Sequence, residues 1–93
     1  MGKEFKGIKG EWKIDLEYKS TERVEIRDSN NNCFIDVWKL GKITEEEMKA
    51  NAKLISKAPE MLEMLEYLHD RLGTAFTQEK QEIEQLIKEA TEF

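Results

Sequence analysis

The sequence predicts an α+β fold, in which an N-terminal three-stranded antiparallel β-meander precedes two to three amphipathic helices. Residues 11–40 alternate apolar and polar side chains with a period of two, as strands do. Residues 44–92 instead repeat apolar side chains every three or four positions, which is typical of helices. A chain of 93 residues has room for one hydrophobic core. We therefore expect a single domain over residues 11–93, preceded by an arm formed by residues 1–10.

The arm is rich in glycine and carries three lysines, Lys3, Lys6 and Lys9. It shows little periodicity, so we expect a flexible basic segment that carries at most an edge strand through Phe5 and Ile8. Its lysines are candidate contacts to nucleic acid.

The first predicted strand covers residues 11–19, where every second residue is apolar: Trp12, Ile14, Leu16 and Tyr18. A turn at Ser20 and Thr21 follows. The second strand alternates Val24 and Ile26 with three charged residues, Arg23, Glu25 and Arg27. We expect its arginines to face Asp15 and Glu17 across the strand pair.

The third predicted strand, residues 33–40, follows an asparagine-rich turn at residues 28–32. It is apolar on both faces, with Ile35 and Val37 on one and Phe34, Trp38 and Leu40 on the other. Two apolar faces predict either that this strand is central, or that one face meets the helices and the other a partner.

The helical half begins with a capping box, in which Thr44 and Glu47 cap the first turn. The inner face of this helix is predicted to hold Met48, Asn51, Ala52 and Ile55. Pro59 predicts a break or sharp kink and opens the next helix, which Gly73 ends. A last helix from about Thr77 places four apolar residues on one side: Ile83, Leu86, Ile87 and Ala90.

The sequence indicates no catalytic machinery, metal site or cofactor, so we predict that the protein is not an enzyme. The sole histidine, His69, follows Glu66 at the spacing of di-iron bundles, but such sites need a second copy of this motif. We therefore expect an exposed helix histidine. Cys33 is the only cysteine, and we expect a small apolar strand residue there rather than a nucleophile. No glycine-rich loop precedes a helix in the way a phosphate site requires.

Charge and hydropathy restrict the location and the partners. No apolar run approaches the ~20 residues that span a bilayer, and the free cysteine fits a reducing compartment. We expect a cytoplasmic protein without membrane contact. Residues 44–93 carry twelve acidic and six basic side chains, which disfavours nucleic-acid binding by the helices. Nucleic acid is expected only indirectly, through the arm, or through Arg23 and Arg27.

The helix after Pro59 carries an acidic strip of Glu60, Glu63, Glu66, Tyr67 and Asp70. Its simpler interpretation is a solvated face, and its sharper one is a docking surface for a basic protein groove. Tyr18, Trp38 and Tyr67 are interface anchors if they are exposed, although burial is the usual state of any one of them. We expect Met61 in the core, and Met48 and Met64 either there or on an adaptable surface.

The stretch NAKLISKAPEMLEML at residues 51–65 resembles the pattern N-A-R-L-I-x-x-A-P-E-L-L-x-x-L of small proteins of tailed phages and prophages. Lys53 replaces the usual Arg, and Met61 the usual Leu. The resemblance covers these residues well and the rest of the layout loosely. It implies a phage protein that acts by binding, a class that includes inhibitors of host CRISPR nucleases.

The leading functional hypothesis is thus a non-enzymatic phage accessory protein that inhibits a host defence system. An anti-CRISPR-type inhibitor would bind an RNA-guided nuclease effector or its guide-RNA complex. One alternative is an oligomeric sponge for a small-molecule or nucleotide immune signal, with a pocket lined by some of Arg23, Arg27, Lys39 and aromatic residues. Another is a replication, transcription or packaging factor whose arm contacts nucleic acid. A homodimer formed through the helices is compatible with all three.

Overall fold

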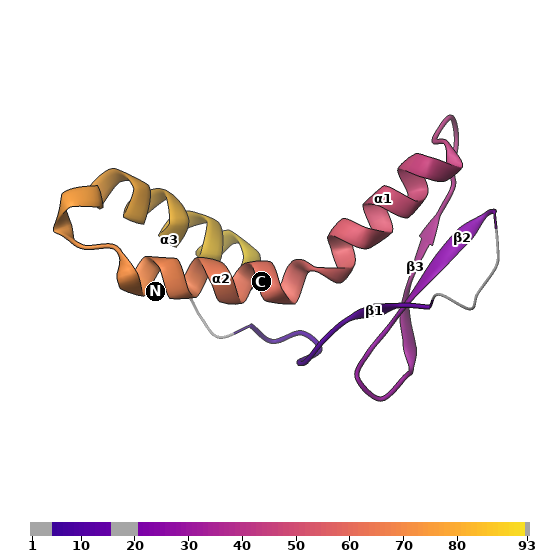
Figure 1. Cartoon of the computed structure of the whole chain (residues 1–93), viewed down its shortest axis with the longest axis horizontal. Helices are drawn as coiled ribbons and strands as arrows, with labels where there is room; N and C mark the ends of the chain where they lie inside the picture. The colour runs from indigo at the N-terminus through magenta and orange to yellow at the C-terminus, as the bar shows by residue number, and fades with distance from the viewer. Residues whose placement is uncertain (1–4, 16–20, 93) are drawn as a thin grey trace. The chain divides into compact units, whose positions relative to one another are not determined.

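The computed structural model describes residues 5–15 and 21–92, and it has the predicted α+β arrangement. Three antiparallel strands come first, and helices follow (Figure 1). The chain divides into two compact units, each described here by itself. Residues 8–59 form the sheet unit, and residues 1–7 together with 60–93 form the helical unit.

The sheet contains β1 (Lys13–Ile14), β2 (Arg23–Arg27) and β3 (Cys33–Trp38), in the order β1-β2-β3. Ile26 of β2 pairs with Ile14 on one side and with Ile35 on the other. The predicted meander is therefore confirmed. The described part of the first strand is shorter than predicted, and the predicted positions of Leu16, Tyr18 and Ser20 lie outside the described residues.

One strand prediction is wrong, and one of the two alternatives for the third strand is excluded. Residues 5–10 form no edge strand, because Gly10 has a φ of 89° and turns the chain, while the carbonyl of Ile8 accepts a hydrogen bond from the Trp12 indole at 3.0 Å. The third strand is also not central. β2 pairs on both sides, so β3 lies at an edge of the described sheet.

A β-bulge accounts for Phe34, one of the three residues of the predicted second apolar face of β3. The register shifts between Ile26 and Arg27, so that Arg27 pairs with Cys33 and Phe34 is the extra residue. Phe34 packs edge-on against Trp12, with ring centroids 5.2 Å apart. The Phe34 ring thus packs against Trp12, a residue that precedes β1.

Helix α1 (Glu45–Ser56) packs against all three strands. Its capping box is present as predicted: the amide of Glu47 donates to Thr44 Oγ1 at 3.1 Å, and the amide of Thr44 donates to Glu47 Oε1 at 3.0 Å. Met48 and Ala52 are fully buried with Ile26, which together form the core of the sheet unit. Asn51 is exposed, contrary to prediction, since it lies at the margin of the buried face.

The helical unit is a hairpin. Helix α2 (Ala58–Arg71) begins after Lys57, so that Pro59 separates two helices and stands in the first turn of the second. A short 3₁₀ helix η1 (Thr74–Phe76) leads into α3 (Thr77–Thr91). None of the described helices combines the length and the apolar character that a bilayer crossing demands.

Candidate functional site

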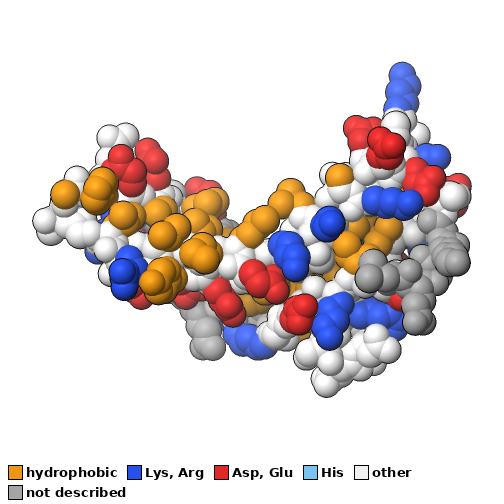
Figure 2. All heavy atoms as spheres, viewed as in Figure 1, with side chains coloured by type: hydrophobic (Ala, Val, Ile, Leu, Met, Phe, Trp, Pro, Cys, Tyr) orange, Lys and Arg blue, Asp and Glu red, His pale blue; other side chains and the backbone are white. Residues whose placement is uncertain are grey.

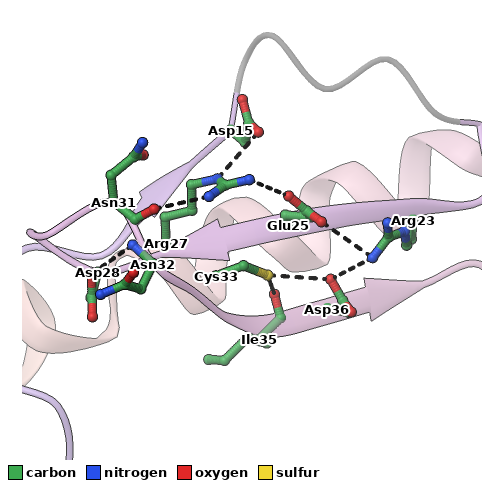
Figure 3. A network of polar contacts seen from close by, with 10 residues as sticks. All are labelled: Asp15, Arg23, Glu25, Arg27, Asp28, Asn31, Asn32, Cys33, Ile35 and Asp36. Atoms are coloured by element: carbon green, nitrogen blue, oxygen red, sulfur yellow. Dashed lines mark hydrogen bonds and ion pairs between the residues drawn. The ribbon is translucent and has the colours of Figure 1, made fainter.

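A row of alternating charges crosses the face of the sheet opposite the Ile26 side chain (Figure 3). Arg27 donates to Asp15 at 3.2 Å and to Glu25 at 2.7 Å. Arg23 reaches Glu25 at 3.2 Å and Asp36 at 3.1 Å. Period-two alternation places these groups on one face, and the predicted pairing of a β2 arginine with Asp15 is confirmed.

The row continues into the turn between β2 and β3. Arg27 also donates to the carbonyl of Asn31 at 2.9 Å, and Asn31 has a φ of 66°, which asparagine tolerates well. Asp28 Oδ1 accepts the amides of Asn30 and Asn32, both at 2.9 Å. Desolvation alone would lower the pKa of Arg27, but the hydrogen bond to Asp15 and the charges of Glu25 and Asp15 raise it.

Arg23 and Arg27 are therefore engaged with carboxylates, which reduces the positive potential that they offer to a phosphate. Arg23 also lies over the ring of Trp38, 5.5 Å from its centroid. Trp38 is 49% exposed, so it meets the condition set for an interface anchor. Of the arm lysines, Lys6 and Lys9 are exposed, and Lys3 lies outside the described residues.

Cys33 is exposed, and its thiol lies 3.7 Å from the carbonyl of Ile35 and 3.6 Å from Asp36 Oδ1. Desolvation and the negative charge of Asp36 raise the pKa of the thiol, so the neutral form is favoured at neutral pH. A neutral thiol is a poor nucleophile.

Glu25, Cys33 and Asp36 place their ligand atoms within 4.8 Å of one another. A metal ion there would have to displace Arg23 and Arg27 from the carboxylates and deprotonate the thiol. The arrangement favours a structural ion-pair network over a metal centre.

The acidic strip of α2 has a different character. Glu60, Glu63, Tyr67 and Asp70 are exposed, and Glu66 is partly buried. Within residues 5–15 and 21–92, Glu60 and Glu63 have no ion-pair partner. The guanidinium of Arg71 lies 5.5 Å from the centroid of the Tyr67 ring. The strip is thus an open surface of carboxylates on one helix.

The prediction of an exposed His69 is wrong, because only 9% of the residue is exposed. His69 lies on the side of α2 that carries Leu65 and Leu72, and Glu84 of α3 approaches it to 3.6 Å. Asp70 lies 3.5 Å from its Nδ1, yet neither ring nitrogen has a hydrogen-bond partner among the described residues. The carboxylate opposite His69 on α3 is therefore Glu84, which no local motif in α2 indicates.

The hairpin also exposes apolar side chains that sequence reasoning placed elsewhere. Met61 is 45% exposed, which contradicts its predicted place in the core, and Met64 and Leu68 are 56% and 40% exposed. Leu86 of α3 is 50% exposed. Figure 2 shows hydrophobic side chains gathered over α2 and α3. The apolar residues of α2 form an arc that runs round the helix from Leu62 to Met64. The width of this arc is the feature of the sequence that could have indicated an exposed apolar surface.

A hollow of about 290 Å³ lies where α2 leads into α3. Leu72, Thr74, Thr77, Lys80 and Glu84 are among the residues that line it. Arg23, Arg27 and Lys39, which were expected to line the pocket of a ligand sponge, are not among the residues that line this hollow.

The described fold is that of a small α+β protein whose polar groups are arranged in networks and open surfaces. The family model of the Salmonella phage P22 protein Y8K6 matches residues 1–92. The chain belongs to this phage protein family, which agrees with the phage origin that the resemblance implied. Comparisons with curated proteins and with solved structures gave no match.

Proposed function

We propose that this phage protein is a non-enzymatic accessory protein that binds and disables a defence component of its bacterial host. The proposed target is an RNA-guided nuclease effector or its guide-RNA complex in the host cytoplasm, which makes the protein an anti-CRISPR-type inhibitor. The observation that carries the proposal is the exposed acidic strip of α2, whose Glu60 and Glu63 are unpaired among the described residues.

The strip fits the electrostatics of such a target. RNA-guided nucleases hold nucleic acid in positively charged channels. From Glu60 to Asp70 the strip extends over about 15 Å of helix, at 1.5 Å per residue. Carboxylates on a rigid helix complement a basic groove without refolding, and the opposite charges accelerate association.

The chemistry of the described residues supports binding rather than catalysis. Desolvation and the negative charge of Asp36 raise the pKa of the Cys33 thiol, and His69 is enclosed between α2 and α3.

The test is inhibition of target cleavage by the purified effector, with association measured by surface plasmon resonance. We expect Glu63→Gln with Asp70→Asn to slow association about tenfold at low ionic strength and to weaken inhibition. The matched control is Glu82→Gln with Glu89→Gln on α3, which removes the same charge and should leave both readouts unchanged. A wild-type protein that neither binds the effectors of its host nor slows their cleavage would refute the proposal.

A further inference from the structure

We infer that the α2–α3 hairpin pairs with a second copy of itself through the apolar face of α2, forming a two-fold symmetric four-helix assembly. This face consists of Met61, Met64 and Leu68 of α2, with Leu86 of α3 beside them. The inference goes beyond the proposed function. Of the acidic strip it uses only Glu60, at the margin of the apolar face, and Glu63 and Asp70 lie on a different side of α2.

The hairpin has little core of its own. Among its described residues, Ile87 is the one apolar side chain that is less than a tenth exposed. His69 and Thr91 are the other buried groups, and both are polar. Two amphipathic helices bury one stripe each against the other, whereas a wider apolar arc requires a further layer.

The spacing of the exposed residues is that of a helix–helix seam. Met61, Met64 and Leu68 lie three and four residues apart, the a, d, a spacing of a heptad. Leu65, His69 and Leu72 follow the neighbouring stripe, which is less exposed and lies on the α3 side. Helix α2 therefore carries two adjacent apolar stripes, of which α3 covers one.

The exposed apolar face supplies a large part of the area that a small dimer needs. A half-exposed large side chain presents on the order of 80 Å², so the four residues present roughly 600 Å² across two copies. The smallest stable interfaces bury about 1,200 Å² in total, of which roughly 65% is apolar in homodimers. The face supplies most of that apolar area, and the stems of flanking charged side chains add to it.

The charges of Glu60 and Arg71 favour an antiparallel orientation of the two copies. Glu60 and Arg71 flank the same edge of the seam, three helical turns apart, and neither has an ion-pair partner among the described residues. A two-fold axis near Met64 sets Met61 against Leu68 of the other copy. It also brings Glu60 near Arg71 of that copy, and the contact repeats by symmetry. A parallel two-fold pairing would place the two copies of this edge on opposite sides of the seam, so Glu60 and Arg71 would not meet.

The first test is the mass of the full-length protein by sedimentation equilibrium. We expect a dimer for the wild type and a monomer for Met64→Glu. The matched control is Ala50→Glu on the exposed side of α1, which adds the same charge and should leave the dimer intact. Circular dichroism should show that all three proteins keep the same helix content. A wild type that stays monomeric at millimolar concentration, or a Met64→Glu protein that stays dimeric, would overturn the inference.

The second test concerns the orientation. Glu60→Arg and Arg71→Glu should each weaken self-association by about tenfold or more, because each opposes like charges twice. Mixing the two variants should restore a heterodimer, in which both contacts again join opposite charges. Failure of the mixture to associate better than either variant alone would exclude the antiparallel seam. Because Glu63 and Asp70 lie off the seam, loss of dimerisation and loss of effector binding can be distinguished.

Discussion

Acidic and large apolar side chains have different surroundings in the sheet unit and in the hairpin. In the sheet unit, Glu25 and Asp36 are each held by an arginine, and Ile26 is completely buried beneath α1. In the hairpin, Glu60 and Glu63 are unpaired among the described residues, and Met64 is more than half exposed. The sheet pairs the charges on one of its faces and buries Ile26 on the other, whereas the hairpin leaves Glu60, Glu63 and Met64 available to other molecules.

This difference follows from the two periodicities. A strand with period two divides its side chains between two faces, so one helix is enough to cover the apolar face while the charges pair on the other. A helix spreads its side chains round a cylinder, and one antiparallel neighbour covers only a single stripe. A broad apolar arc on a two-helix hairpin therefore remains partly exposed.

The largest expected effect lies in the core of the sheet unit. Ile26→Ala should lower the free energy of unfolding by about 2–5 kcal/mol, because it leaves a cavity between the strands and α1. Urea denaturation followed by circular dichroism measures the change. Leu40→Ala is the control: Leu40 is 65% exposed, and its loss should cost less than about 0.5 kcal/mol. Similar losses at both positions would contradict the assignment of the core.

An intermediate effect is expected at the start of α1. Thr44→Ala removes the hydroxyl that accepts the Glu47 amide, and it should lower the free energy of unfolding by about 1 kcal/mol. Urea denaturation at neutral pH measures the loss. A change as large as that at Ile26 would show that α1 depends on its cap more than on its packing.

The capping box also has a pH signature. The hydrogen bonds from the Thr44 backbone and side chain lower the pKa of Glu47. A lowered carboxyl pKa stabilises the fold fully above the ordinary glutamate pKa of about 4.3, and that contribution is lost as the pH falls through the lower folded value. Glu47→Gln keeps a capping amide but does not titrate, so its stability should fall less than that of the wild type below that pH. Identical acid profiles for the two proteins would argue against this contribution.

The smallest expected effect concerns the reactivity of Cys33. Asp36→Asn removes a negative charge that raises the pKa of the thiol, so the thiolate fraction at pH 8 should increase. Alkylation by iodoacetamide, followed by mass spectrometry, should then proceed several-fold faster. The label is specific because the chain has one cysteine. Glu46→Gln on α1 is the control and should leave the alkylation rate unchanged. An unaltered rate in Asp36→Asn would show that Asp36 does not influence the pKa of the thiol.

Local patterns predicted the parts of the structure that depend on local geometry. The meander, the pairing of Arg27 with Asp15 and the capping box of Thr44 and Glu47 all arise from near neighbours or from period-two alternation. Met61 was predicted in the core but is exposed, and His69 was predicted to be exposed but is buried. Periodicity identifies an apolar arc but not which part of it a neighbouring helix covers, and that choice depends on the packing of α3.

The acidic strip was predicted as a set of residues on one helix face, and the structure places four of its five members on the surface. The sequence predicted arginine partners for carboxylates of the sheet such as Asp15, but it could not show that Glu60 and Glu63 have no ion-pair partner among the described residues.

The contrast between the two units is tested most directly by amide hydrogen exchange of the full-length wild-type protein at several protein concentrations. We predict that protection of α2 and α3 increases with concentration, because a second copy covers the hairpin, while protection of β2 and α1 stays constant. Protection that is independent of concentration in both units would show that the hairpin, like the sheet unit, is complete within a single chain.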